Sequence, residues 1–184
     1  SRHNAEYIEI RAQTLSKTML TMKDGVIEAA KEGRENGVAI RVLVDGTWGF
    51  ASVGSFDKAK LRDAVEKACR MAKATARKVK TPIKLAETKT VEDKVVYKPK
   101  KNPAEIPLSE KIHMASSINK TLFSYDPRIK SCTIDYLDVT GTDHFINNDG
   151  TYIEQDKLYV WSRILAVAKE GEVFAFARDE VGST

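Results

Sequence analysis

The sequence has little of what a self-contained enzyme or a membrane protein carries. No apolar run approaches the length of a transmembrane helix, and no signal-peptide pattern opens the chain. Its histidines, His3, His113 and His144, are far apart, and there is no HExxH, P-loop, GxSxG or GxGxxG motif. Glu110 and His113 have helical i, i+3 spacing, but one such pair supplies too few ligands for a metal site. The residues therefore indicate no self-sufficient active site in this chain.

Cysteine is also scarce, and a large excess of one charge is missing. Cys69 and Cys132 are the two cysteines, and neither belongs to a CxxC pattern. Each lies in a run of apolar periodicity, which predicts buried free thiols in a reducing compartment and hence a cytoplasmic location. The 30 Lys and Arg residues stand against 26 Asp and Glu, for a net charge of +4. This near balance favours solubility over an obligatory nucleic-acid partner.

At 184 residues, the chain is long enough to form one domain with a sizeable core. The chain begins at Ser1 without a methionine and stops at Thr184 directly after a strand-like run. We therefore expect it to be part of a longer polypeptide.

The stretch Gly37–Ser52 predicts the central element, a tight β-hairpin. Two alternating runs flank Asp45-Gly46, where a type I′ turn suits Gly and is tolerated by Asp. The resulting register gives one wholly apolar face, made of Val38, Ile40, Val42, Val44, Gly49, Ala51 and Val53. The other face carries Leu43, Arg41, Trp48 and Phe50, with Arg41 over Phe50 or, diagonally, over Trp48. The first face is predicted to be core. The second is either packed or a contact surface, and packing is favoured.

The remaining residues of the range 1–53 are predicted to form further antiparallel strands. Tyr7–Leu15 alternates, and residues 18–22 and 26–30 flank a second Asp-Gly turn at Asp24-Gly25, so about five strands are expected. A helix over 57–79 follows, with Asp57 as N-cap. Its alanine row, Ala64, Ala68, Ala72 and Ala76, is predicted to pack on the Gly49 and Ala51 side of the hairpin. Its basic face could bind phosphate, but Asp63 and Glu66 interrupt it and favour a solvated face.

Residues 80–107 contain four of the five prolines and predict an extended connection with one edge strand near Val95–Tyr97. A second helix is expected over 109–123, capped by Ser109. Residues 128–180 then predict a β-meander with strands at 129–139, 142–147, 151–168 and 173–178. The nearly apolar run Leu158–Ala168 is typical of a central strand covered on both faces. The predicted fold is α+β: a two-layer α/β sandwich of mostly antiparallel sheet and two main helices, followed by the meander.

Counting residue pairs outward from a predicted turn of the meander gives a further hypothesis. With Glu170-Gly171 as the loop residues, Arg163 would lie opposite Arg178. Like charges directly opposite are destabilising unless an anion lies between them. Arg163 and Arg178 could therefore hold a carboxylate from this chain or a partner. A slipped register or splayed, solvated arginines are the alternative, and the alternative is favoured.

Gly37–Ser52 also resembles the TldD/PmbA family, the modulators of DNA gyrase. The family pattern is an eGvaiRV run, then Asp-Gly, then Trp-Gly-Phe-Ala-Ser, and Gly37–Val42, Asp45-Gly46 and Trp48–Ser52 match it. The turn Asn147–Gly150 is similar to a second family feature, with Asn148 where Ser is expected. The closing run Arg178–Ser183 resembles the TldD branch. The resemblance covers essentially the whole chain.

Members of this family resemble zinc metallopeptidases, with an N-terminal α/β sandwich and a catalytic, β-rich C-terminal domain. The resemblance implies that a downstream HExxxH helix binds zinc and activates a water. Residues 1–184 contain no such motif, so no catalytic or metal residue is carried over. It also implies a homodimer or a TldD/PmbA-type heterodimer acting on unfolded or modified peptides.

The leading hypothesis is therefore the N-terminal scaffold and peptide-guiding domain of a TldD-type zinc metallopeptidase. Its expected partners are its own C-terminal catalytic domain, a second subunit and the peptide, and no membrane. Candidate partner or peptide contacts are Arg41, Trp48, Phe50, Arg163 and Arg178. The alternatives are a non-catalytic regulatory module that binds a protein or nucleic acid through the basic helix face, and a bare dimerisation module.

Overall fold

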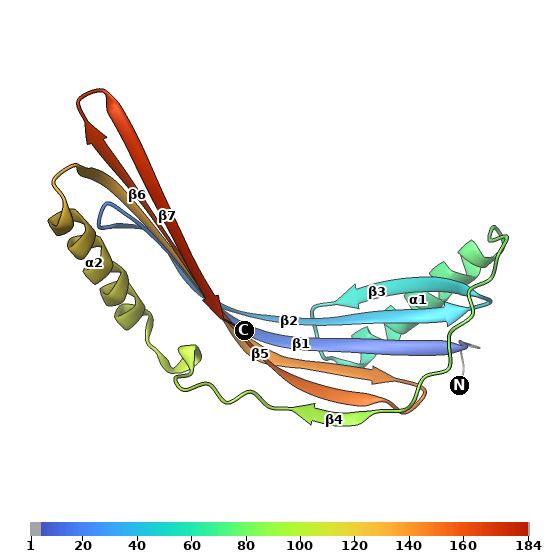
Figure 1. Ribbon diagram of the computed structural model, residues 1–184. Coiled ribbons are helices and arrows are strands. Elements are labelled where there is room, and N and C mark those ends of the chain that lie inside the picture. Colours follow the sequence, from blue (N-terminus) through green and yellow to red (C-terminus); the bar gives the residue numbers. More distant parts are fainter. Residues whose placement is uncertain (1–4, 184) are drawn as a thin grey trace. The chain divides into compact units, whose positions relative to one another are not determined.

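A computed structural model describes residues 5–183 of the chain (Figure 1). The elements in chain order are β1 (Tyr7–Lys23), β2 (Val26–Val44), β3 (Thr47–Val53), α1 (Lys58–Ala76), β4 (Glu92–Val95), the short 3-10 helix η1 (Pro103–Glu105), α2 (Leu108–Tyr125), β5 (Ile129–Asn147), β6 (Tyr152–Glu170) and β7 (Val173–Ser183). Across the described residues the strands form a hydrogen-bonded sheet in the order β3-β2-β1-β5-β6-β4, and β7 pairs with β6. The predicted α+β class is confirmed.

The described residues form two compact units where the sequence predicted one domain. Unit 1 extends to Thr14 and includes residues 35–96 and 142–156, whereas unit 2 contains Leu15–Arg34, Tyr97–Gly141 and the chain from Lys157 on. Long strands run through both units, but each unit has its own helix and its own buried cluster. A single core did not form because α1 and α2 cover different stretches of the strands.

The strands are longer and fewer than predicted. Five strands were expected in residues 1–53, but β1 and β2 are continuous over 17 and 19 residues. A break was expected at Thr140-Gly141, but β5 runs through it. Asp24 and Asp45 have positive φ, at 51° and 49°, as the two predicted Asp-Gly turns require. Glycine also accepts extended backbone, so Gly141 alone is no turn signal.

Unit 1 is built on the hairpin as predicted. The observed β2–β3 register pairs Val44 with Thr47, Arg41 with Phe50 and Val38 with Val53. Its apolar face is buried under α1, together with Ala64, Ala68 and Ala72 of the predicted alanine row. The Asp57 carboxylate caps α1 by accepting from the amides of Ala59 and Lys60. The helix ends at Ala76, earlier than expected, because the next amides bond three residues back.

Unit 2 has a smaller core under α2, made of Leu20, Met22, Ala115, Cys132 and Ile134. The predicted Ser109 cap is wrong. The N-cap position is Pro107, which makes no side-chain hydrogen bond, so Ser109 lies inside the first turn. The shift follows from η1, which Asn102 caps just before the chain enters α2 through Pro107. Proline cannot continue a hydrogen-bonded turn and so marks the boundary.

The prediction that both faces of Leu158–Ala168 are covered is wrong for the described residues. These side chains are partly exposed, because in unit 2 the helix α2 covers one face of the sheet. The proline-rich connection contains an edge strand, but it lies earlier than the expected Val95–Tyr97: β4 spans Glu92–Val95 and pairs in parallel with β6. No helix among residues 5–183 is long and apolar enough to cross a membrane.

Both cysteines are buried free thiols, as predicted. Burial raises the pKa of each thiol. Asp24 adds to this at Cys132, whereas at Cys69 the charge of Lys73 opposes it and that of Glu66 adds to it.

Candidate functional site

Three of the candidate contact residues lie together on the face of unit 1 that is turned away from α1. Side chains alternate along a strand, so the residues that do not face α1 gather on this surface, which we call the open face. It carries Arg41, Trp48 and Phe50 from the hairpin, Tyr7, Glu9 and Arg11 from β1, and Phe145 from β5.

The Arg41 guanidinium stacks on Trp48 in the diagonal arrangement that the hairpin register allows. Its central carbon is 4.3 Å from the Trp48 ring centroid. Tyr7 makes a T-shaped contact with the same indole, with ring centroids 6.0 Å apart and an 83° angle between the planes. Trp48 is therefore in contact with both a cation and a second aromatic ring, which fixes its orientation.

Glu9 is the buried anion at the centre of the open face. Its side chain is 8% exposed, and its Oε2 accepts from Arg41 Nη2 at 3.0 Å. The Tyr7 hydroxyl donates to the same oxygen at 3.1 Å. Arg11 Nε is 3.6 Å from Oε1, and the Arg11 guanidinium lies over Phe145. Burial raises the pKa of Tyr7, and its bond to Glu9 adds to this while a bond from Asn147 opposes it.

A small pocket of about 240 Å³ opens beside this network. It is lined by Glu9, Arg11, Ala39, Arg41 and Phe50. The Arg11 and Arg41 side chains are 67% and 46% exposed, and Phe50 is 53% exposed. Two guanidiniums share one carboxylate here, so the pocket wall carries an excess of one positive charge.

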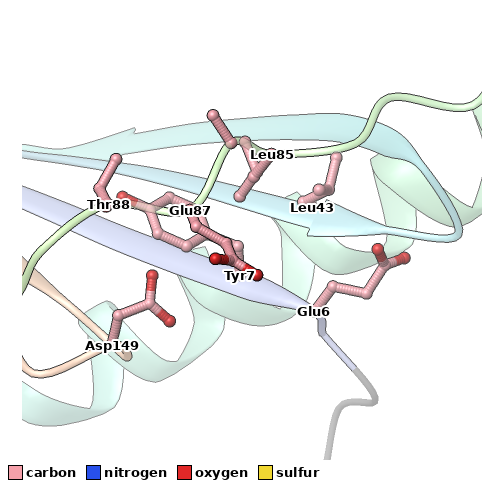
Figure 2. Close-up of a pocket in the computed structure, with 8 residues that line it drawn as sticks. Glu6, Tyr7, Leu43, Leu85, Glu87, Thr88 and Asp149 are labelled. Carbon is pink, nitrogen blue, oxygen red and sulfur yellow. The ribbon is translucent and has the colours of Figure 1, made fainter.

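A larger pocket, of about 490 Å³, lies on the same face under the connection between α1 and β4 (Figure 2). Figure 2 shows Leu85, Glu87 and Thr88 of that connection on the opposite side of the strands from α1. The lining combines Tyr7, Leu43 and Leu85 with the carboxylates of Glu6, Glu87 and Asp149. This pocket therefore has the opposite charge to the small one.

The connection that covers this pocket is anchored at both ends. The Ile83 amide donates to the Gly46 carbonyl at 2.8 Å, and a Cβ on Gly46 would lie 2.4 Å from Pro82 Cβ. At the other end the Thr90 hydroxyl donates to the Asp149 carbonyl, and the Tyr152 amide donates to Val91. These anchors bury Leu43, which the sequence left open as either core or surface.

The predicted pair of Arg163 and Arg178 is not formed. The observed loop residues are Gly171 and Glu172, so Arg163 lies opposite Glu180, and Arg178 lies opposite Leu165. Arg163 binds Asp135 through two nitrogens, at 3.0 and 2.6 Å, and Arg178 pairs with Glu180. The slipped register that was the favoured alternative is the one found, and each arginine holds its own carboxylate.

Unit 2 contains a buried ion pair that the sequence did not reveal. Lys111 Nζ is 2.6 Å from Asp138 Oδ2, and the two side chains are 1% and 3% exposed. Lys111 Nζ also donates to the Thr18 hydroxyl at 2.9 Å. Burial raises the pKa of Tyr136, as does its hydrogen bond to Asp138. The sequence did not indicate this ion pair, because Lys111 is a lysine on an amphipathic helix and its partner Asp138 lies 27 residues further along the chain.

Within residues 5–183 no group of three or more His, Cys, Asp or Glu side chains is placed to hold a metal ion. The spacing of Glu110 and His113 therefore has no further ligands around it among those residues. His144 Nδ1 is instead 3.3 Å from the Tyr152 hydroxyl. His3 lies outside the described residues.

Changing Glu9 to Gln is expected to lower the free energy of unfolding by about 1–3 kcal/mol, because Arg41 and Arg11 lose the charge that holds them. Urea titration measures this. Glu66→Gln is the matched control, since Glu66 pairs with Arg70 at 3.8 Å on α1 and both side chains are largely exposed. We expect it to change stability by less than about 0.5 kcal/mol. Equal effects of the two substitutions would contradict a special role for Glu9.

Comparison with known proteins identifies relatives of this chain. The family model described as PmbA/TldA metallopeptidase domain 1 matches residues 8–72, and the one described as the PmbA/TldA metallopeptidase central domain matches residues 101–184. A metalloprotease of Methanothermobacter thermautotrophicus is 30% identical over 97% of this chain and 38% of its own length. A metalloprotease of Methanocaldococcus jannaschii is 29% identical over 96% of this chain and 39% of its own.

Solved structures share the fold. TldE from Thermococcus kodakarensis superposes with a TM-score of 0.74 at 20% identity, over 96% of this chain and 40% of that one. A putative modulator of DNA gyrase from Bacteroides thetaiotaomicron gives a TM-score of 0.76 at 18% identity, over 99% of this chain and 42% of that one. The chain thus spans about two-fifths of the length of the proteins that it matches.

Proposed function

Because this chain belongs to the PmbA/TldD metallopeptidase family, we propose that it is the N-terminal scaffold of a TldD-type zinc metallopeptidase and guides extended peptides to a catalytic region outside residues 1–184. The peptides would be unfolded or modified, and the enzyme would work as a homodimer or as a heterodimer of TldD and PmbA types. The buried, unbridged cysteines are consistent with a cytoplasmic enzyme.

The observation that carries this proposal is the extent of the match. The first and central domains of the family account for most of this chain, whereas the chain covers 38% of the Methanothermobacter metalloprotease. Family membership implies a metal in the full-length enzyme, and zinc would there polarise a peptide carbonyl or activate a water. The described residues do not fit such a site. We therefore assign no step at the metal to this chain.

The residues of this chain would act by holding the peptide. An extended peptide binds a free strand edge through main-chain hydrogen bonds, and adjacent side chains supply selectivity. β3 and β4 end the strand order of the sheet, so each has an edge with no strand partner among the described residues. Next to the β3 edge, the open face offers Phe50, Trp48 and Arg41 as side-chain contacts.

The strand β7 supports an extensive contact with the rest of the enzyme. All its residues from Val173 to Ser183 are exposed, with Val173, Phe174, Phe176 and Val181 at 64–79%. A long edge strand that exposes several large apolar side chains is an aggregation hazard unless another segment covers it. We assign that role to the catalytic region of the same polypeptide.

The test is hydrolysis of an unstructured, fluorescently quenched peptide by the full-length polypeptide that contains this chain. Phe50→Ser is expected to raise KM by about three- to tenfold at unchanged kcat, because it removes an apolar peptide contact. Met71→Ser is the control, since Met71 on α1 is also 53% exposed. Equal KM values for the two variants would refute peptide guidance by the open face. DNA binding that weakens steeply with salt, without peptide hydrolysis, would support the regulatory alternative.

A further inference from the structure

We propose that the pocket between Arg11 and Arg41 binds a carboxylate group of the peptide. This inference rests on the proposed function, since it names the group that the open face would recognise. We call it the two-arginine pocket, and its lining is Glu9, Arg11, Ala39, Arg41 and Phe50.

The two guanidiniums are held in place before any ligand arrives. Arg41 is stacked 4.3 Å from the Trp48 centroid, and Arg11 is 4.9 Å from the Phe145 centroid. Both are also drawn to the buried carboxylate of Glu9, at 3.0 and 3.6 Å. Stacked and ion-paired arginines lose little further conformational entropy when they bind an anion.

After these contacts the two guanidiniums still have N–H donors available for a ligand. A guanidinium has five N–H donors, and the contacts with Glu9 use a minority of them on each arginine. One buried carboxylate between two guanidiniums leaves one positive charge uncompensated within the pocket. Arginine donors suit planar oxyanions, so a carboxylate matches both the charge and the geometry.

The size and polarity of the two-arginine pocket limit further which ligand it can bind. A volume of about 240 Å³ is below the usual range of pockets for drug-sized molecules and suits one residue of a peptide. Ala39 and the half-exposed Phe50 provide an apolar wall next to the guanidiniums. The larger neighbouring pocket carries Glu6, Glu87 and Asp149 and would repel the same group. Of these two pockets, the two-arginine pocket is therefore the one whose charge suits a carboxylate.

The carboxylate has two possible sources, the C-terminus of a peptide or an acidic side chain. Three acetylated hexapeptides separate them: Ac-AAGAAF with a free C-terminus, Ac-AAGAAF amidated, and Ac-AADAAF amidated. Binding to the full-length polypeptide is followed by the fluorescence of Trp48, in a background where Trp161→Phe removes the other tryptophan of residues 1–184. Tryptophans outside these residues are replaced in the same way.

We expect one of the two carboxylate peptides, or both, to bind about five- to tenfold more tightly than the neutral peptide. Arg11→Gln should abolish this ratio, and 300 mM salt should reduce it. Arg70→Gln should leave it unchanged, because Arg70 is likewise 67% exposed and paired with a glutamate, but lies on α1. Arg41→Lys, which keeps the charge and loses the planar donors, should lower the ratio without abolishing it.

Equal binding of all three peptides would overturn the inference, as would a carboxylate preference that survives Arg11→Gln. Circular dichroism of the Arg11→Gln variant confirms that any loss is not due to unfolding. The readout does not depend on hydrolysis. A peptidase whose KM responds to Phe50→Ser but which shows no carboxylate preference would keep the proposed function and remove this inference alone.

Discussion

Replacing Gly49 with alanine is expected to lower the free energy of unfolding of unit 1 by about 3 kcal/mol or more. A Cβ built on Gly49 would lie 1.9 Å from the Ala68 carbonyl oxygen and 2.8 Å from its carbon. Both atoms belong to the backbone of α1, so no side chain can rotate away. The helix would have to move off β3 and open the core around Val42 and Ala68. Urea titration gives the size of the effect, and amide exchange in β2 and β3 gives its location.

Gly37→Ala is the matched control for this substitution. Gly37 is also a strand glycine of unit 1, but a Cβ there meets nothing within 4 Å. We expect a change within about 0.5 kcal/mol, in either direction. If Gly49→Ala proved as stable as Gly37→Ala, the close approach of α1 to β3 would be wrong, and with it the reason for a glycine between Trp48 and Phe50.

The hairpin could be predicted because its determinants are local. An Asp-Gly pair fixes the turn, the turn fixes the register, and alternation then assigns every side chain to a face. That register left two partners open for Arg41, Phe50 and Trp48, and the structure has the second. Together with the alanine row of α1, it also predicted the contact of Gly49 with α1. Helix α1 could be predicted for the same reason, since its cap and its alanine row lie within one short segment.

The predictions that were wrong or missing concern features that depend on contacts between residues distant in the sequence. Either Glu170-Gly171 or Gly171-Glu172 could form the β6–β7 loop. The second is found where Glu170 pairs with Arg128 at 3.2 Å and the Lys169 amide bonds to the Arg128 carbonyl. These contacts hold Glu170 in the strand and shift Arg163 away from Arg178. In the same way, Glu9 could be placed on the open face of β1, but not beside Arg41, which is 32 residues away.

Lys111→Met is expected to destabilise unit 2 by about 3–5 kcal/mol, because it leaves the Asp138 carboxylate charged, buried and without its cation. Asp138 is 3% exposed, and the Lys111 ammonium 2.6 Å away is its ion-pair partner among the described residues. Thr18 would lose its hydrogen bond to the ammonium as well. Urea titration measures the loss, and amide exchange in α2 and β5 locates it.

Lys101→Met is the control for removing a lysine from an ion pair near the same helix. Lys101 is 67% exposed and lies 3.0 Å from Glu110, so solvent screens the pair and we expect a cost below about 0.5 kcal/mol. The double variant Lys111→Met with Asp138→Leu should recover most of the stability that the single variant loses, since neither buried charge remains. A cost for Lys111→Met as small as that for Lys101→Met would mean that water reaches Asp138, and the buried pair would then not hold α2 on β5.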